Sequence, residues 1–159
     1  MLQGDGRHDS PHLFGCLYVS LEAIATVAEQ LARLTGTFVD EADLVRGGQP
    51  LSLATISLPD EAELVDLDDP AVLTREGLRP SRVATGDRTL TQAQAASLFQ
   101  EHREAVGLRW WSTFESLWAN VTLFDRAGEA LGLDDVRPLD LGDEVVREAA
   151  RFLGLRLAT

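Results

Sequence analysis

Short apolar runs and helical periods follow one another irregularly along this chain. LFGCLYV, residues 13–19, is an apolar run rich in aromatic and branched side chains, which indicates a buried strand. The segment SLEAIATVAEQLARLTG places apolar residues on one helical face, and it predicts a helix from an N-cap at Ser20 to Gly36. Glu29 lies at the edge of that face, so its carboxylate can point into a cleft beside the core.

The middle of the chain contains two further strand patterns and one further helix. Residues 51–67 predict two strands joined by a turn at Pro59-Asp60-Glu61. Residues 68–88 contain several turn signals and predict a long irregular connection. Thr91 and Gln94 form a capping-box pattern ahead of QAQAASLFQEHREAV, which predicts a helix closed by Gly107.

The last third of the chain predicts strands and then a helix. RWWS and NVTLFD read as strands around Trp118, residues 143–153 as an amphipathic helix ended by Gly154, and LRLA as a short strand. Because helices and strands do not alternate regularly, we expect an α+β fold with small mixed or antiparallel sheets and packed helices. We expect a single domain over residues 1–159, in which residues 1–12 form a loop or a shortened amino-terminal end.

Composition and charge exclude several classes of protein. The chain has 159 residues, enough for one domain with a core, and 45% of them are hydrophobic. Its net charge is −12, and all 14 basic residues are arginines, so direct binding to nucleic acid is not expected. The single cysteine excludes an internal disulfide. Without a signal peptide or an 18-residue apolar run, we expect a cytoplasmic protein that does not enter a membrane.

The common catalytic motifs are missing. The sequence has no Walker A loop, GxSxG elbow, HExxH motif or CxxC motif. His8 and His12 can be grouped with Asp5 and Asp9 as metal ligands, but they lie on a proline-containing segment that fixes no geometry. We therefore expect structural or solvent-exposed histidines there, and no metal.

Four other residues carry the chemistry that the sequence suggests. Arg7, Tyr18 and Glu29 follow one another at even eleven-residue intervals, and Ser112 lies far downstream in an aromatic-rich stretch. Taken singly, they read as a loop cation, a core ring, a surface acid and a strand-end hydroxyl. Taken together, a guanidinium, a ring, a carboxylate and a hydroxyl are the groups needed to hold and split a charged nucleotide cofactor.

The order and context of these residues resemble the RES domain family, which is named for its arginine, glutamate and serine. The resemblance extends from Gly6 to about Asp125. It is carried by Gly6-Arg7, Leu17-Tyr18, Ala28-Glu29, the strand end from Gly107 to Ser112, and the stretch NVTLFDR. Family members generally carry another arginine on an earlier first strand, and the segment before Arg7 is too short to contain it.

The resemblance implies a fold, an activity and a partner. The fold would be similar to that of ADP-ribosyltransferases, and the activity would be that of a toxin from a toxin–antitoxin pair that consumes NAD by hydrolysis or phosphorolysis. NAD is then the substrate, and an Xre-type antitoxin protein the partner. Glu29 and Ser112 would be catalytic, whereas Arg7 and Tyr18 would bind NAD, and no metal is needed.

Two alternatives share this resemblance. The same site would serve a protein ADP-ribosyltransferase, which transfers ADP-ribose to a protein side chain. A catalytically inactive, N-terminally shortened RES domain would instead act as an antitoxin-binding module. The residues do not choose the nucleophile among water, phosphate and a protein side chain.

Overall fold

The chain folds into two compact units, each built from two separate stretches of sequence. The computed structural model describes residues 4–158. One unit, called here unit 1, comprises Met1–Leu21 with Leu58–Leu131, and unit 2 comprises Glu22–Ser57 with Gly132–Thr159. Of the expected amino-terminal loop, residues 1–3 lie outside the described residues. Its remainder is a loop, as predicted, with an isolated bridge between Ser10 and Phe14.

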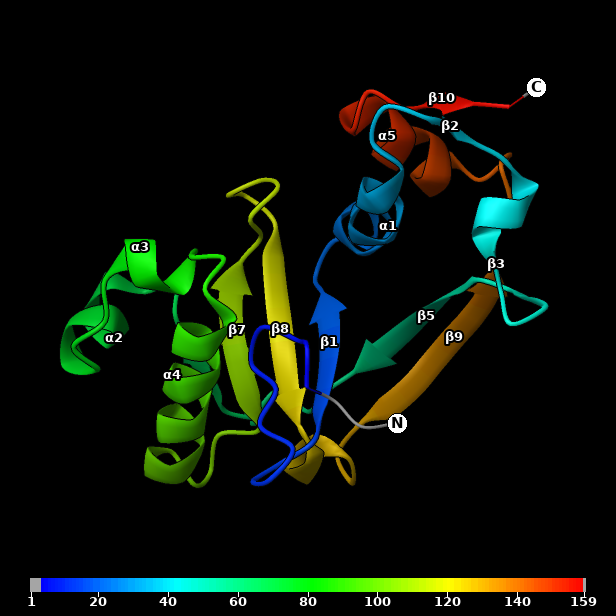
Figure 1. Ribbon diagram of the computed structural model, residues 1–159. Helices are drawn as coiled ribbons and strands as arrows, with labels where there is room; N and C mark the ends of the chain where they lie inside the picture. Colours follow the sequence, from blue (N-terminus) through cyan, green and yellow to red (C-terminus); the bar gives the residue numbers. More distant parts are fainter. Residues whose placement is uncertain (1–3, 159) are drawn as a thin grey trace. The chain divides into compact units, whose positions relative to one another are not determined.

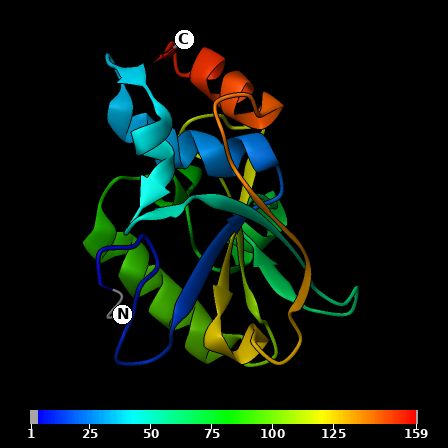
Figure 2. The ribbon, with the colours of Figure 1, turned by 90° about the vertical axis from the view of Figure 1, so that its right-hand side faces the viewer.

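Unit 1 is organised around a four-stranded mixed sheet. Its strands, in spatial order, are β1 (Cys16–Ser20), β8 (Ala119–Phe124), β7 (Gly107–Trp111) and β6 (Leu64–Asp66). β8 runs antiparallel to both of its neighbours, whereas β6 and β7 are parallel. The carboxyl ends of β1, β7 and β6 therefore lie at the same edge of the sheet. The antiparallel arrangement of β1 and β8 can be followed in Figures 1 and 2.

Helices cover one face of this sheet. They are α2 (Pro70–Arg75), α3 (Pro80–Val83) and α4 (Arg88–Glu101), and a short 3₁₀ turn, η3 (Asp125–Ala127), follows β8. The expected irregular connection over residues 68–88 was thus wrong, because it contains α2 and α3. Each of these helices has a proline in its first turn, where the missing N–H costs nothing, so the prolines start helices here.

The start of α4 also differs from the prediction. Asp87 is the N-cap, and its carboxylate accepts a hydrogen bond from the Leu90 N–H. The predicted capping box at Thr91 was wrong: Thr91 lies inside the helix, 1% exposed, and donates its hydroxyl to the Arg7 carbonyl at 2.5 Å. Gly107 begins β7 and does not close the helix. Asp87 provides the charged acceptor that favours a helix start.

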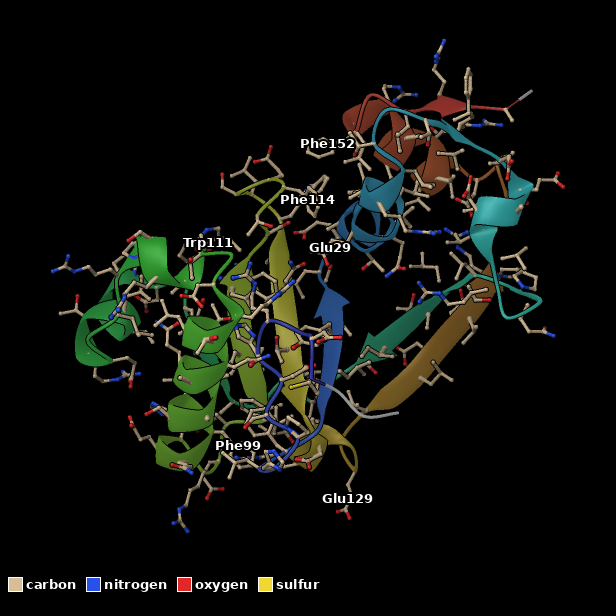
Figure 3. The ribbon with its side chains drawn as sticks, viewed as in Figure 1. Glu29, Phe99, Trp111, Phe114, Glu129 and Phe152 are labelled. Carbon is tan, nitrogen blue, oxygen red and sulfur yellow. The ribbon has the colours of Figure 1, made fainter. Side chains whose placement is uncertain are left out.

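The core of unit 1 lies between the sheet, α4 and the segment that precedes β1. The segment and α4 lie on the same face of the sheet in Figures 1 and 2. The buried side chains of this core include Phe14, Val65, Leu98, Leu108, Trp110 and Phe124. The rings of Phe14 and Phe99, the latter labelled in Figure 3, lie 4.5 Å apart. This packing fixes the amino-terminal segment over β1 and β8.

Unit 2 contains two helices that lie side by side and several short strands (Figures 1 and 2). The helices are α1 (Ala23–Leu31) and α5 (Glu144–Phe152), with 3₁₀ turns η1 (Ala32–Leu34) and η2 (Glu41–Leu44). The paired strands are β5 (Ser52–Ser57) with β9 (Gly132–Pro138), β2 (Phe38–Val39) with β10 (Arg156–Leu157), and β3 (Val45–Arg46) with β4 (Gln49–Pro50). The tail helix and the short strand after it were predicted correctly.

The first helix begins later than the sequence suggested. Ser20 is the last residue of β1, and its hydroxyl donates to Asn120 Oδ1 at 2.6 Å. Its predicted role as the N-cap was therefore wrong, and α1 begins at Ala23 after Glu22. Gly36 has a φ of 85°, a conformation that favours glycine, and it follows the helical segment as predicted.

The α+β class with small mixed and antiparallel sheets is confirmed. The two strands expected within residues 51–67 exist, but they do not pair with each other, since β5 pairs with β9 and β6 with β7. The helices that the structure describes include none long and apolar enough to cross a membrane.

We expect that Asp143→Ala destabilises the protein by about 1 kcal/mol, because Asp143 caps α5. Its carboxylate accepts hydrogen bonds from the Val145 N–H and from Arg137. The Arg137 hydrogen bond is the main cause that holds the pKa of Asp143 below its usual value, against the effect of burial. A carboxyl with a lowered folded pKa stabilises only when ionised. This contribution is thus present above the unfolded pKa of about 3.9 and lost as the pH falls through the folded pKa.

Urea unfolding of the wild type and Asp143→Ala at neutral pH and at about pH 3 checks this expectation. The difference between the two proteins should shrink in acid. Glu144→Ala, which removes an exposed carboxylate next in the chain, is the matched control and should show a smaller loss. A difference that stays constant over this pH range contradicts the expectation.

Candidate functional site

Buried polar side chains gather on the helix-covered face of the sheet in unit 1. The strand register aligns Tyr18 with Thr122 and Ser20 with Asn120. Asn120 is 2% exposed and Thr122 is fully buried. Alternate residues of a strand share a face, so these four side chains lie on one face. Such groups are costly to bury unless they are hydrogen-bonded, which makes this face the candidate site.

The Tyr18 hydroxyl takes part in two hydrogen bonds with the amino-terminal segment. It donates to Asp9 Oδ1 at 2.6 Å and accepts from the His8 N–H at 2.9 Å. Burial raises the pKa of Tyr18 well above its usual value, and the hydrogen bond to Asp9 raises it further. The phenol is therefore neutral at physiological pH. Tyr18 itself is 38% exposed, so part of its surface remains accessible.

Arg7 lies within the same segment and is only 8% exposed. Its Nη1 donates to the carbonyls of Val83, at 3.0 Å, and Thr85, at 2.7 Å. Its guanidinium carbon lies 4.9 Å from the centre of the Trp110 ring, a cation–π distance. Arg7 thus joins the end of α3 to the amino-terminal segment, a structural role that the sequence did not reveal. Both of these hydrogen bonds are donated by Nη1.

His8 is a buried neutral histidine. It is 3% exposed, and its Nδ1 lies 2.7 Å from Thr122 Oγ1. Thr122 Oγ1 also accepts from Trp110 Nε1 at 3.1 Å, so its own proton is available for His8 Nδ1. Burial, with a smaller effect of Arg7 and Arg88, lowers the pKa of His8 to about 3. His8 is a structural histidine, whereas His12 is exposed.

Ser112 follows the last residue of β7 and is 2% exposed. Its hydroxyl accepts a hydrogen bond from the Phe114 N–H at 3.1 Å, and its own N–H donates to the Trp118 carbonyl at 2.8 Å. Continuing the alternation of β7, Ser112 shares its face with Leu108, which is aligned with Thr122. The sheet therefore places Ser112 and Tyr18 on one face, with Ser112 at the carboxyl edge.

Glu29 belongs to unit 2. It lies in the last turns of α1 and is exposed (Figure 3). The buried residues of α1 are Ala25, Val27, Ala28 and Leu31, so Glu29 borders the apolar face, as the periodicity predicted. Of the four candidates, the fold of unit 1 brings Arg7 and Tyr18 together through His8 and places Ser112 on their sheet.

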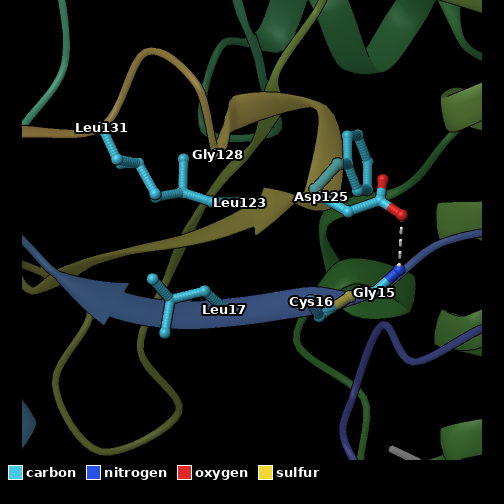
Figure 4. Close-up of a pocket in the computed structure, with 8 residues that line it drawn as sticks. Gly15, Cys16, Leu17, Leu123, Asp125, Gly128 and Leu131 are labelled. Carbon is cyan, nitrogen blue, oxygen red and sulfur yellow. Dashed lines mark hydrogen bonds between the residues drawn. The ribbon is translucent and has the colours of Figure 1, made fainter.

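Two pockets lie elsewhere in unit 1. One, of about 280 Å³, is shown in Figure 4; there Asp125 accepts a hydrogen bond from the Gly15 N–H at 3.1 Å. It is lined by Gly15, Cys16, Leu17, Leu123, Phe124, Asp125, Gly128 and Leu131. The other, of about 270 Å³, lies between α4 and the residues that follow α2, Glu76 and Leu78. Neither is lined by the four candidate residues.

Three side chains beside the second pocket have the composition of a metal site. One ligand atom from each of Glu76, Glu101 and His102 lies within 4.8 Å of the other two. Glu76 Oε1, however, already accepts from Arg75 Nε at 2.8 Å and from His102 Nε2 at 3.2 Å. Burial raises the pKa of Glu76, but these hydrogen bonds outweigh it and lower the pKa overall. We interpret the group as an ion-pair cluster that joins α2 to the end of α4.

Sequence reasoning missed much of the polar network. His8 was expected to be structural or solvent-exposed, but neither His8 nor Asp9 was assigned a hydrogen bond, and Thr122 and Asn120 were not considered. A signal for the last two exists in NVTLF, where polar residues occupy alternate positions of an otherwise apolar strand. This alternation identifies a polar stripe on one face of a buried strand.

The chain belongs to the RES domain family, whose profile matches residues 2–143. Arg7, Tyr18, Glu29 and Ser112 all lie within the matched region. No curated protein matches the sequence.

Among solved structures, the chain is similar to one from the "Crystal structure of the M.tuberculosis MbcT-MbcA toxin-antitoxin complex". The TM-score is 0.61 at 19% sequence identity, and the match covers 95% of this chain and 76% of that chain. At this identity the likeness shows a shared fold.

Proposed function

We propose that this chain is a RES-type toxin that cleaves NAD at the bond between nicotinamide and ribose. The observation that carries the proposal is its membership of the RES domain family, over a region that contains all four candidate residues. The polar face of unit 1 supports it, because a phenol and a hydroxyl lie on that face of the sheet and a guanidinium lies in the segment packed against it.

The proposed reaction breaks the bond between ribose C1′ and the nicotinamide nitrogen. The bonding electron pair moves to nicotinamide, which leaves as a neutral molecule, and positive charge develops on the ribose. The Glu29 carboxylate stabilises this charge more in the transition state than in the ground state, which is the condition for catalysis. A nucleophile then bonds to C1′. Water yields ADP-ribose and a proton, and phosphate yields the phosphorylated sugar.

The other residues hold the substrate. Arg7 binds the pyrophosphate with its guanidinium. Tyr18 presents its ring to the nicotinamide ribose, because its O–H already donates a hydrogen bond to Asp9. Ser112 Oγ accepts from the Phe114 N–H and keeps a proton with which to orient a ribose hydroxyl, the nicotinamide amide or the nucleophile. The reaction requires no metal.

We also propose that an antitoxin protein of the Xre type binds this chain. The support is the shared fold with a chain from a toxin–antitoxin complex. Co-expression with such a protein from a neighbouring gene should yield a complex on size-exclusion chromatography and suppress NAD loss. Two separately eluting proteins and unchanged NAD loss contradict this partner.

Mass spectrometry of NAD and its products, with and without inorganic phosphate, tests the proposed function. Free ADP-ribose indicates hydrolysis, and its phosphate indicates phosphorolysis. Label from NAD fixed to a protein band in a lysate indicates a protein ADP-ribosyltransferase. Intact NAD under all conditions favours the inactive, antitoxin-binding alternative.

Ser112→Ala should slow NAD loss by up to about tenfold, because a neutral hydrogen bond contributes about 0.5–1.5 kcal/mol. The matched control is Ser116→Ala, which removes an exposed hydroxyl from the same connection between β7 and β8. Equal rates for the two variants contradict a role for Ser112.

A further inference from the structure

We propose that Asp9 is a positioning residue for Tyr18: its carboxylate accepts the phenol O–H, fixes the ring, and leaves the phenol oxygen able only to accept. Asp9 lies two residues after Arg7 in the amino-terminal segment. The part of this inference that concerns NAD rests on the proposed function. The part that concerns the phenol stands on unit 1 alone.

The contacts of Asp9 employ both of its carboxylate oxygens. Oδ1 accepts from the Tyr18 hydroxyl at 2.6 Å, and Oδ2 accepts from the Gly6 N–H at 2.8 Å. Asp9 is 5% exposed, so these hydrogen bonds replace solvent around a buried charge. A hydrogen bond to a carboxylate is stronger than one between neutral groups, so it holds the phenol O–H in one orientation.

The backbone closes around this pair of side chains. The His8 N–H donates to the phenol oxygen at 2.9 Å. A Cβ at Gly6 would lie 2.4 Å from Asp9 Oδ1 and 2.5 Å from Tyr18 Oη, so only glycine fits there. The turn that carries Arg7 therefore packs directly against the hydrogen-bonded side chains of Asp9 and Tyr18.

This geometry decides what Tyr18 offers to a ligand. A phenol has one O–H, and Asp9 accepts its hydrogen bond, so Tyr18 donates no hydrogen bond to substrate. Its remaining contributions are an accepting oxygen and the ring, which is partly exposed. A leaving nicotinamide is neutral and needs no acid, so a proton-donating tyrosine is not required at the proposed site.

The hydrogen bond can be observed directly because Tyr18 is the only tyrosine in the chain. Protein labelled with ¹³Cζ-tyrosine gives one NMR resonance that reports on this hydroxyl. Asp9→Ala should shift the resonance, and Asp9→Asn, which keeps an acceptor oxygen, should shift it less. The control is Asp5→Ala, which removes an exposed carboxylate from the same segment and should leave the resonance unchanged. An Asp9→Ala spectrum equal to that of the wild type overturns the proposal.

A double-mutant cycle on NAD cleavage tests the consequence for the substrate. Asp9→Ala and Tyr18→Phe should each raise KM by about tenfold or more, with a smaller change in kcat, because a hydrogen bond to a charged group is lost. Asp9→Ala should add little once Tyr18→Phe is present, and Asp9→Asn should restore part of the loss. Fully additive effects on KM mean that Asp9 acts through the turn alone and contradict positioning.

The NMR experiment and the kinetic experiment distinguish a failure of the positioning role of Asp9 from a failure of the proposed function. A wild-type protein that leaves NAD intact contradicts the proposed function, and the NMR experiment then decides the positioning by itself. Should Asp9→Ala unfold, Asp9→Asn serves the NMR experiment, and Asp9→Asn with Tyr18→Phe serves the kinetic one, because each substitution retains most of the native side-chain shape. An Asp9→Asn resonance indistinguishable from that of the wild type then counts against a charge-assisted hydrogen bond.

Discussion

Glu29→Gln slows NAD cleavage by about a thousandfold while leaving the fold intact. At about 4 Å and an effective dielectric constant near 20, an ion pair between a carboxylate and the cationic ribose contributes roughly 4 kcal/mol, which corresponds to about a thousandfold in rate. Glu29 is exposed on α1, and glutamine has nearly the same size and shape, so we expect the fold to remain intact. The melting temperature should therefore stay unchanged, and the loss should fall on kcat.

The matched control for this variant is Glu148→Gln, which neutralises another exposed carboxylate of the same unit, on α5. It should retain the wild-type rate. The measurement is NAD depletion by purified protein. Full activity of Glu29→Gln removes Glu29 from the mechanism, and a fall in both variants indicates a general effect of charge.

Arg7→Ala lowers the free energy of unfolding by about 2–3 kcal/mol, because it removes a charged donor from two carbonyls. The Thr85 carbonyl and the Val83 carbonyl lose their hydrogen bonds from Nη1, and the ring of Trp110 loses its cation. Arg82→Ala is the control, because Arg82 lies on α3 but is exposed. Urea unfolding should show a large loss for the first variant and little for the second.

The same variant separates the two roles of Arg7. Under conditions where it is folded, Arg7→Ala should also raise KM for NAD, because the pyrophosphate loses a cation. A large loss of stability with an unchanged KM contradicts phosphate binding and leaves the contact with α3 as its role. Unchanged stability contradicts the structural role.

The pattern of apolar residues predicted the elements that a single local signal defines. β7, β8 and α5 were found because their runs are apolar or strongly periodic and their ends are marked by polar residues. The start of α4 was misplaced because Asp87 and Thr91 both suit an N-cap, and only tertiary contacts buried Thr91. β9 was missed because its residues are mostly exposed and give no apolar alternation.

The roles of the four candidate residues stay predictions. Arg7, Tyr18 and Ser112 follow from a family pattern, and unit 1 places them on one sheet or in the segment packed against it. The network beneath them was not predictable in this way, because His8 and Thr122 are 114 residues apart and meet only in the folded protein. For the same reason, the structural contact between Arg7 and the end of α3 has no local signature.

Proton NMR of NAD incubated with the purified chain shows whether the chain cleaves NAD between nicotinamide and ribose. The resonances of the nicotinamide ring in NAD should disappear while those of free nicotinamide grow in equal amount. Glu29→Gln should show neither change over the same time. NAD that remains intact with the wild-type protein, or that is lost without release of nicotinamide, contradicts the account.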